Sequence, residues 1–225
     1  MKKGKLIIFE GLDGSGKATQ LDLLTKYLEK TFGKDKFVTY DFPRYYDNYW
    51  GGVVGRMLRG DFGTRINPYL RSIFYLLDQK DASDVFKKDL EQGRSVICNR
   101  YMTSSMIFQT GFFKVLKDKN EYLDWLETTA FKELNLVKPD LVLALSVDPQ
   151  VTKELNGKKA ARAYLKDKKD INEKNIQVQI HAKAVMMRLC KERKDWKLIN
   201  CMKEGKLRTP EDIAAEIKGI VTKII

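Results

Sequence analysis

The segment FEGLDGSGKATQ, from Phe9 to Gln20, carries the strongest structural signal in this 225-residue chain. It carries the pattern G-x-x-x-x-G-K as Gly11, Gly16 and Lys17, between a short apolar run and a segment with helical spacing. Such a turn points successive backbone N–H groups at phosphate oxygens, and the helix N-terminus adds its dipole. The sequence therefore predicts a nucleotide-phosphate loop, with Lys17 against the β- and γ-phosphates. The residues expected to bind ATP are Gly11, Leu12, Asp13, Gly14, Ser15, Gly16, Lys17, Ala18 and Thr19.

Short apolar runs alternate with longer amphipathic stretches along the chain. Strands are expected at Lys5–Glu10, Lys36–Asp41, Ser95–Asn99, Leu141–Val147 and Lys197–Cys201. Helices are expected at Lys17–Phe32, Pro68–Gln92, Asn120–Leu134, Lys174–Lys191 and from Pro210 to the C-terminus. This alternation implies right-handed crossovers and a parallel sheet covered on both faces. We expect an α/β fold, in which a single domain over residues 1–225 has a five-stranded parallel sheet flanked by helices.

The formal net charge of +12 favours an anionic partner, which is a nucleic acid, a membrane surface or a phosphorylated small molecule. A Lys-rich surface can also reflect the composition of the host. No nucleic-acid-binding signature accompanies the charge, so we expect no nucleic-acid partner. Part of the charge lies between Thr152 and Lys174, a segment with weak apolar periodicity. This pattern indicates a mobile basic flap over residues 150–174, although a solvated run of charges has the same composition.

Cysteine and histidine are sparse. Cys98, Cys190 and Cys201 form no C-x-x-C pair, so neither a disulfide framework nor a zinc site is indicated. His181 is the single histidine, which excludes a multi-histidine metal centre. No signal peptide is visible, and no apolar run has the length of a bilayer span. These features favour a reducing, cytoplasmic setting without a membrane partner.

Four segments of the chain, in the same order and spacing, resemble the thymidylate kinase family. They are the phosphate loop with Asp13, Phe42-Pro43-Arg44-Tyr45, Asn99-Arg100-Tyr101 (the family has Asp-Arg-Tyr), and the basic flap followed by Asp170-Ile171-Asn172-Glu173. The resemblance implies a P-loop NTP hydrolase fold of the nucleoside monophosphate kinase type, with the flap as its LID. It also implies a homodimer that uses ATP and Mg²⁺ to phosphorylate dTMP to dTDP, in dTTP synthesis.

Two arginines follow the carboxyl ends of predicted strands, where α/β sheets bind ligands. A guanidinium at Arg44 can fork onto the phosphate of the acceptor nucleotide, and one at Arg100 can neutralise charge between donor and acceptor. The alternatives are a surface arginine in a turn and a salt bridge at a strand end. The expected catalytic residues are Lys17, Arg100 and, from the flap, Arg162.

The resemblance also assigns residues to the acceptor nucleotide. It places Tyr75 against the base, Phe108 near sugar and base, and Asp13 on the sugar 3′-hydroxyl. Without the resemblance, Phe74 and Tyr75 are typical core residues. The full set expected to bind the acceptor is Asp13, Phe42, Pro43, Arg44, Tyr75, Gln79, Arg100, Ser104, Ser105 and Phe108.

Three residues depart from the family pattern. Gln79 stands where the family has an arginine that reads thymine; its amide suits thymine or uracil, and equally another base. Ala18 lacks the usual hydroxyl that faces Mg²⁺, and Asn99 replaces a carboxylate. Asp13 and Glu173 are candidates to compensate, with Mg²⁺ held mostly by phosphates and water. The departures leave open a kinase for other nucleoside monophosphates, or a degenerate nucleotide-binding protein without transfer activity.

Overall fold

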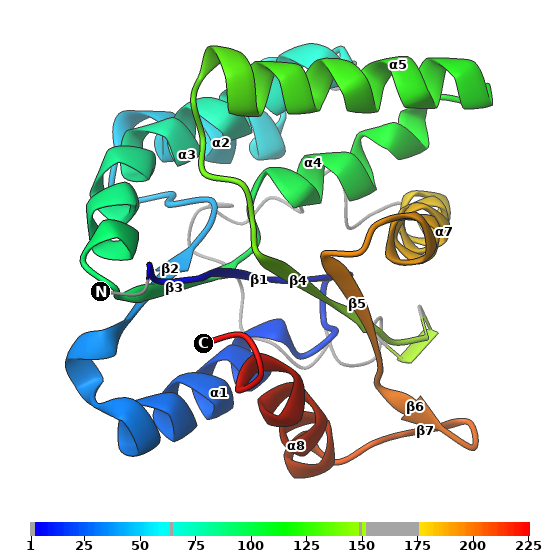
Figure 1. The fold of residues 1–225 in the computed structure, drawn as a ribbon. Helices are drawn as coiled ribbons and strands as arrows, with labels where there is room; N and C mark the ends of the chain where they lie inside the picture. Colours follow the sequence, from blue (N-terminus) through cyan, green and yellow to red (C-terminus); the bar gives the residue numbers. More distant parts are fainter. Residues whose placement is uncertain (1–2, 64, 149, 152–175) are drawn as a thin grey trace.

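The computed structural model describes residues 3–63, 65–148, 150–151 and 176–225. Its centre is a parallel sheet with strand order β2-β3-β1-β4-β5 (Figure 1). The strands are β1 (Leu6–Gly11), β2 (Phe37–Asp41), β3 (Ser95–Asn99), β4 (Leu141–Ser146) and β5 (Trp196–Asn200). The predicted five-stranded parallel sheet is confirmed, because each strand lies within about a residue of its expected position.

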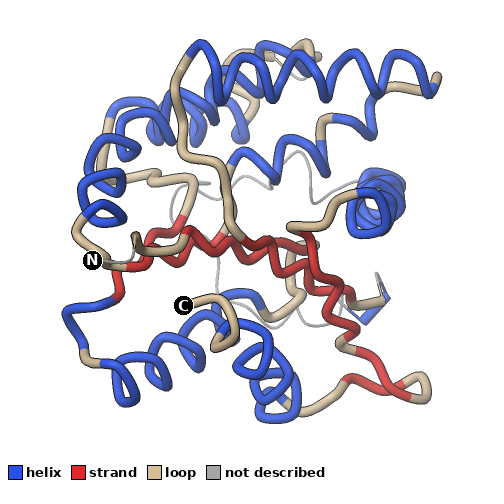
Figure 2. Tube along the Cα trace, viewed as in Figure 1, coloured by secondary structure: helices blue, strands red, loops and turns tan. Residues whose placement is uncertain are grey.

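Helices cover both faces of this sheet, as the tube in Figure 2 shows. One face carries α1 (Lys17–Phe32) and α8 (Pro210–Val221). The other face carries α2 (Tyr49–Arg59), α3 (Pro68–Glu91), α4 (Met102–Phe108), α5 (Leu116–Glu127) and α7 (Ile176–Glu192). Short turns η1 (Lys34–Lys36), η2 (Thr110–Phe112) and η3 (Thr128–Glu133) and a hairpin of β6 (Met202–Lys203) and β7 (Lys206–Leu207) complete the described elements.

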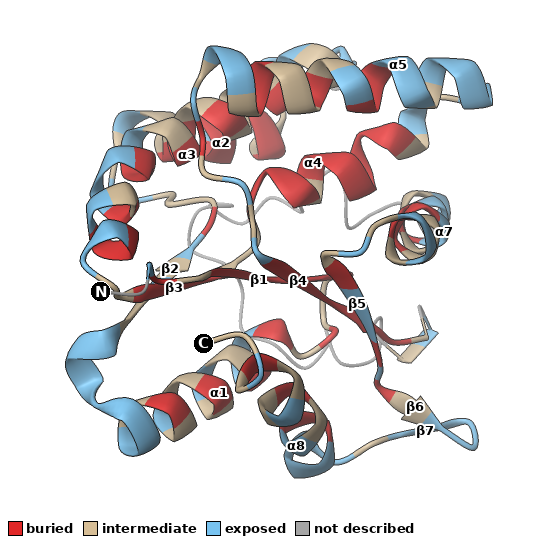
Figure 3. Ribbon diagram, in the orientation of Figure 1, coloured by how far each residue is buried: buried red, intermediate tan, exposed pale blue. Residues whose placement is uncertain are grey.

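The sheet separates two hydrophobic cores. Leu6 and Ile8 of β1 pack into the core beneath α3, α4, α5 and α7. Ile7 and Phe9 point to the opposite face and join the core formed with α1 and α8. Side chains alternate between the faces of a strand, so a strand covered on both sides must be apolar at successive positions. Figure 3 shows β1, β3 and β4 buried along most of their length, which explains the run LIIF.

Two short helices were not expected from the sequence. The segment of α2, YWGGVVGRMLR, is rich in glycine, which disfavours a helix in isolation. A Cβ atom added at Gly51 would lie 2.0 Å from the Arg44 carbonyl oxygen, so glycine permits close packing on the chain before the helix. In α4, almost every side chain is buried, and the amphipathic period that identifies a helix is missing.

The helix expected over Asn120–Leu134 differs in its bounds. It begins earlier, at Leu116, and α5 ends at Glu127, where the π-helical turn η3 continues the chain. In this turn Leu134 N donates to Thr129 O at 2.9 Å, so the hydrogen bond spans one residue more than in an α-helix. Among the described helices, none has the length and apolar character that a bilayer span requires.

Candidate active site

A cavity of about 510 Å³ opens at the carboxyl ends of the central strands. Asp41 at the end of β2 is paired in register with Asn99 at the end of β3, and β3 is paired with β1, which leads into the phosphate loop. Lys17, Arg44 and Arg100 all line this cavity. The parallel register therefore brings together three cations that are far apart in the sequence.

The phosphate loop depends on a glycine at its first turn. Gly11 has φ 151°, and a Cβ atom there would lie 2.5 Å from Ser15 Oγ and 2.7 Å from the Leu145 carbonyl oxygen. Gly14 and Gly16 have φ values of 83° and 85°, in the left-handed region that glycine adopts without strain. The loop therefore curls tightly enough to direct backbone N–H groups into the cavity.

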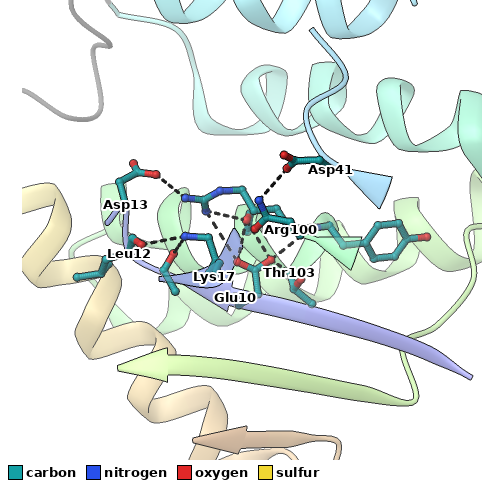
Figure 4. A network of polar contacts seen from close by, with 11 residues as sticks. Glu10, Leu12, Asp13, Lys17, Asp41, Arg100 and Thr103 are labelled. Atoms are coloured by element: carbon teal, nitrogen blue, oxygen red, sulfur yellow. Dashed lines mark hydrogen bonds and ion pairs between the residues drawn. The ribbon is translucent and has the colours of Figure 1, made fainter. Parts of the chain in front are cut away.

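Lys17 begins α1 and is folded back over the loop. Its ammonium group donates to the Gly11 and Leu12 carbonyl oxygens at 3.0 and 2.9 Å (Figure 4). The positive charge of Lys17 therefore lies at the loop, beside the cavity.

The residues predicted to bind ATP lie in three different environments. Several line the cavity, namely Asp13, Gly14, Gly16, Lys17 and Ala18. Three are buried in the loop, namely Gly11, Leu12 and Ser15, whereas Thr19 is exposed on α1. Ala18 lines the cavity, so the side-chain position that lacks the usual hydroxyl faces it.

Arg100 follows β3 in a left-handed conformation, with φ 65°, and its N–H donates to the Phe9 carbonyl oxygen at 2.9 Å. Its guanidinium donates to Asp13 Oδ1 at 2.6 Å and to Ser104 Oγ at 3.2 Å (Figure 4). The guanidinium also lies over the Phe108 ring, at 5.3 Å from its centroid. Burial alone lowers the pKa of Arg100, but Asp13 and Glu10 more than offset this effect and raise it. Arg100 is therefore a fixed cation between the loop and the acceptor side.

Arg44 is held by acidic residues of α3. Its Nε donates to Asp78 Oδ1 at 3.2 Å, and its Nη2 donates to Asp81 Oδ2 at 2.7 Å. Asp78 is fully buried and also accepts from the Arg44 N–H at 3.0 Å and from Asn48 Nδ2 at 2.8 Å. Burial raises the pKa of Asp78, while these hydrogen bonds oppose the rise. Asp78 and Asp81 were not predicted to orient Arg44.

A smaller pocket of about 70 Å³ adjoins the cavity and shares Asp13, Pro43, Tyr45 and Arg100 with it. Of the predicted acceptor residues, Tyr75, Ser104, Ser105 and Phe108 line this pocket as well. Phe42 is 3 % exposed and packs in the core, against Tyr40, Phe86 and Tyr101.

Gln109 was not predicted, yet it lines the small pocket. It is 2 % exposed, and its Oε1 has no hydrogen-bond partner in the described part of the chain. Gln79 on α3 is equally buried, and its Oε1 also lacks a partner there, but Gln79 is not part of the pocket lining. A buried amide oxygen without a partner is costly, so each is available to a ligand.

Oxygen atoms suitable for Mg²⁺ are present in the cavity, which is lined by Asp13, Asp41 and Asn99. Asn99 Nδ2 donates to Asp41 Oδ1 at 2.7 Å, and Asn99 Oδ1 has no hydrogen-bond partner among the described residues. Within those residues there is no cluster of three or more acidic, histidine or cysteine ligands. The donor set therefore fits an ion held largely by phosphates and water.

Some expectations fall outside the described residues. Residues 152–174 of the predicted basic flap, including Arg162 and the metal candidate Glu173, lie there. Glu10, which is fully buried beneath the cavity, was not predicted as a site residue. A single acid in an otherwise apolar strand was the available signal, because a buried charge requires partners.

Comparison with known proteins gives a consistent result. A model of the thymidylate kinase family matches residues 9–213. The probable thymidylate kinase of Pyrococcus abyssi is 26 % identical over 220 residues, covering 96 % of this chain and 97 % of its own. The thymidylate kinase of Thermosipho africanus is 29 % identical over 223 residues, with coverages of 96 % and 97 %.

Solved structures show the same fold. The thymidylate kinase of Candida albicans superposes with a TM-score of 0.74 at 20 % identity, covering 98 % of this chain and 92 % of its own. That of Ehrlichia chaffeensis has a TM-score of 0.66 at 19 % identity, with coverages of 97 % and 99 %. The family match spans most of the sequence and includes the phosphate loop, Arg44 and Arg100. The chain therefore belongs to the thymidylate kinase family of nucleoside monophosphate kinases.

Proposed function

We propose that this chain transfers the γ-phosphate of ATP to the phosphate of dTMP, giving ADP and dTDP. The observation that carries the proposal is the single cavity lined by Lys17, Arg44 and Arg100, in a chain of the thymidylate kinase family. Two phosphorylated substrates brought together carry a high negative charge, and these cations offset it. An acceptor phosphate is already ionised near neutral pH, since its second pKa is about 6, so the reaction needs no strong general base.

On the donor side, the loop amides hold the ATP phosphates. We expect the Lys17 ammonium to exchange the Gly11 and Leu12 carbonyl oxygens for β- and γ-phosphate oxygens. Lys17 lines the cavity as well as contacting these carbonyl oxygens, so its ammonium group lies next to the expected phosphate site.

On the acceptor side, Arg44 holds the dTMP phosphate and Arg100 lies between the two phosphates. In the structure Arg100 is paired with Asp13 at 2.6 Å. When dTMP binds, we expect Arg100 to turn to the transferring phosphoryl group and Asp13 to accept a hydrogen bond from the sugar 3′-hydroxyl. Alignment and charge stabilisation of this kind supply most of the catalysis in phosphoryl transfer.

The base occupies the small pocket beside Tyr75 and Phe108, whose rings offer apolar faces for contact. The Gln109 amide offers both a donor and an acceptor in this pocket, and its Oε1 has no hydrogen-bond partner among the described residues. Thymine N3–H can donate to that oxygen, and a carbonyl oxygen of the base can accept from the amide nitrogen. We assign Gln109 to base recognition, beside the role predicted for Gln79.

Mg²⁺, when bound at these phosphates, would neutralise part of their charge. Asp13, Asp41 and Asn99 would hold it, mainly through water. Several expectations stay predictions: the homodimer, the cytoplasmic setting, the absence of a nucleic-acid partner, and the roles of Arg162 and Glu173.

An acceptor panel tests the proposal. ADP release is measured with ATP, Mg²⁺ and each nucleoside monophosphate in turn, and we expect dTMP to give the highest kcat/KM. If dTMP is among the poorest acceptors, the substrate assignment is wrong. If ATP binds but single-turnover transfer with excess enzyme is absent for every acceptor, the chain is a degenerate kinase.

A further inference from the structure

Glu10 is a carboxylate at the end of a buried apolar strand, and the proposed reaction gives it no role. It is 0 % exposed and lies below the cavity, between the phosphate loop and α4 (Figure 4). A buried charge is costly unless hydrogen bonds and opposite charges surround it. Glu10 has both.

The two oxygens of Glu10 have different surroundings. Oε1 accepts from Thr103 Oγ1 at 2.7 Å, from Ser104 Oγ at 3.0 Å and from the Tyr101 N–H at 3.3 Å. Oε2 accepts from Ser104 Oγ at 2.8 Å and lies 3.9 Å from Arg100 Nη1. One oxygen therefore anchors the carboxylate to α4, and the other faces Arg100.

Ser104 connects the two charged groups. Its hydroxyl donates to Glu10 and accepts from Arg100 Nη1 at 3.2 Å. Arg100 thus has Asp13 on the cavity side, and Glu10 with Ser104 behind it. Asp13 is the partner that the guanidinium gives up when substrate binds, whereas Glu10 is 0 % exposed and inaccessible to substrate.

Electrostatics favour the same arrangement. Burial raises the pKa of Glu10, and the charge of Arg100, the hydroxyls of Thr103 and Ser104, and the charge of Lys17 act against this rise. The carboxylate is therefore placed where it attracts Arg100 and Lys17, two of the three cations of the transfer site.

We propose that Glu10 is a positioning residue, which holds the Arg100 guanidinium through Ser104 at the point of phosphoryl transfer. The inference rests on the proposed transfer to dTMP. A catalytic group gains most from supports that fix its orientation before the substrate arrives. Glu10 supplies this support from below, where no substrate competes for it, and Ser104 passes it on to Arg100.

Glu10→Gln and Thr103→Val form a matched pair of variants. An amide at position 10 retains an acceptor for Thr103 and the Tyr101 N–H, but places an uncharged N–H₂ group toward Arg100. Valine at position 103 removes the hydrogen bond to Oε1 of the same carboxylate, but it leaves the charge of Glu10, its Oε2 and Ser104 in place beside Arg100. Because Arg100 keeps Asp13 as a charged partner, the substitution leaves no uncompensated cation, and we expect Glu10→Gln to fold.

The measurements are kcat, the KM values for ATP and dTMP, and the midpoint of thermal unfolding. We expect Glu10→Gln to lower kcat by about 10- to 100-fold, the range for groups that orient an active residue, with the KM for ATP unchanged. Thr103→Val should keep kcat within about 3-fold of wild type, because any loss there is structural. Equal losses of kcat in the two variants would overturn the proposal.

A double-mutant cycle with Arg100→Lys separates positioning from a general defect. If Glu10 acts through Arg100, Glu10→Gln should lower the single-turnover rate by less than about 3-fold in the Arg100→Lys background. The same loss in both backgrounds would overturn the proposal. If Glu10→Gln does not fold, Ser104→Ala replaces it in the same cycle, and the same comparison of single-turnover rates is made. A wild-type enzyme inactive on dTMP would refute the proposed function itself, and the same assay reports that case separately.

Discussion

The phosphate loop takes its binding groups from one continuous stretch of backbone, whereas the acceptor side of the cavity takes its groups from side chains on several separate elements. Gly11, Gly14 and Gly16 shape the loop through their own φ angles. Arg44 and Arg100, in contrast, are oriented by carboxylates on α3, β1 and the loop. The donor side is thus fixed locally, and the acceptor side is fixed only by the complete fold.

The largest expected effect comes from Arg100, where the two sides meet. Arg100→Ala should lower the single-turnover rate by at least about 10³-fold, as for an arginine that stabilises the transferring phosphoryl group. ATP affinity should stay within about 3-fold of wild type, because the loop amides and Lys17 hold the donor. Isothermal titration with a non-hydrolysable ATP analogue checks this. Equal losses of ATP affinity and transfer rate would break the distinction between the two sides.

The carboxylates of α3 provide a second test. Asp78→Asn removes the buried charge that orients Arg44, and kcat/KM for dTMP should fall by about 10- to 100-fold, since breaking a buried pair is costly. Asp81→Asn is the matched control. Asp81 contacts the same guanidinium from a half-exposed position, and exposed ion pairs contribute little, so an effect of about 2-fold is expected. If Asp81→Asn is the more damaging variant, the buried pair does not orient Arg44.

A moderate effect is expected at the base. Gln109→Leu removes a hydrogen-bonding amide from the small pocket, and the KM for dTMP should rise by roughly 10-fold, which corresponds to about one hydrogen bond. The KM for ATP should not change. Gln79→Leu, measured in parallel, compares the residue that lines the pocket with the one predicted from the family pattern. A larger rise in KM for Gln79→Leu would reassign base recognition.

The smallest expected effect is a gain. Ala18→Ser restores a hydroxyl at the start of α1, facing the cavity that holds the nucleotide phosphates. Because Mg²⁺ keeps much of its coordination from water and phosphates, the Mg²⁺ concentration that supports half-maximal rate should fall by only about 2- to 5-fold. Titration of Mg²⁺ at saturating ATP and dTMP measures this. A loss of activity would show that the serine side chain obstructs the loop.

Much of the fold followed from the sequence, because its signals are local. The loop pattern between an apolar run and a helix identified the donor side, and the five apolar runs identified the sheet strands. Strand and helix periods are properties of neighbouring residues, so they require no knowledge of distant contacts.

The missing parts depend on tertiary contacts. The glycines of α2 oppose a helix in isolation, and only packing of Val54, Met57 and Leu58 against α3 residues makes the segment helical. Asp78 and Asp81, the partners of Arg44 on α3, lie 34 and 37 positions further along the chain. The Glu10–Arg100 contact joins two strands that are adjacent only in the folded sheet. Charge and spacing along the chain do not predict such long-range contacts.

A bisubstrate analogue gives the most direct test of the central claim that one cavity aligns donor and acceptor through Lys17, Arg44 and Arg100. The measurement is a crystal structure of the enzyme with adenosine and thymidine joined by a five-phosphate bridge. We predict that the bridge lies in the cavity and accepts hydrogen bonds from all three side chains, with thymine beside Tyr75 and Gln109. A bridge that contacts Lys17 but leaves Arg44 and Arg100 on Asp78 and Asp13 would contradict the account.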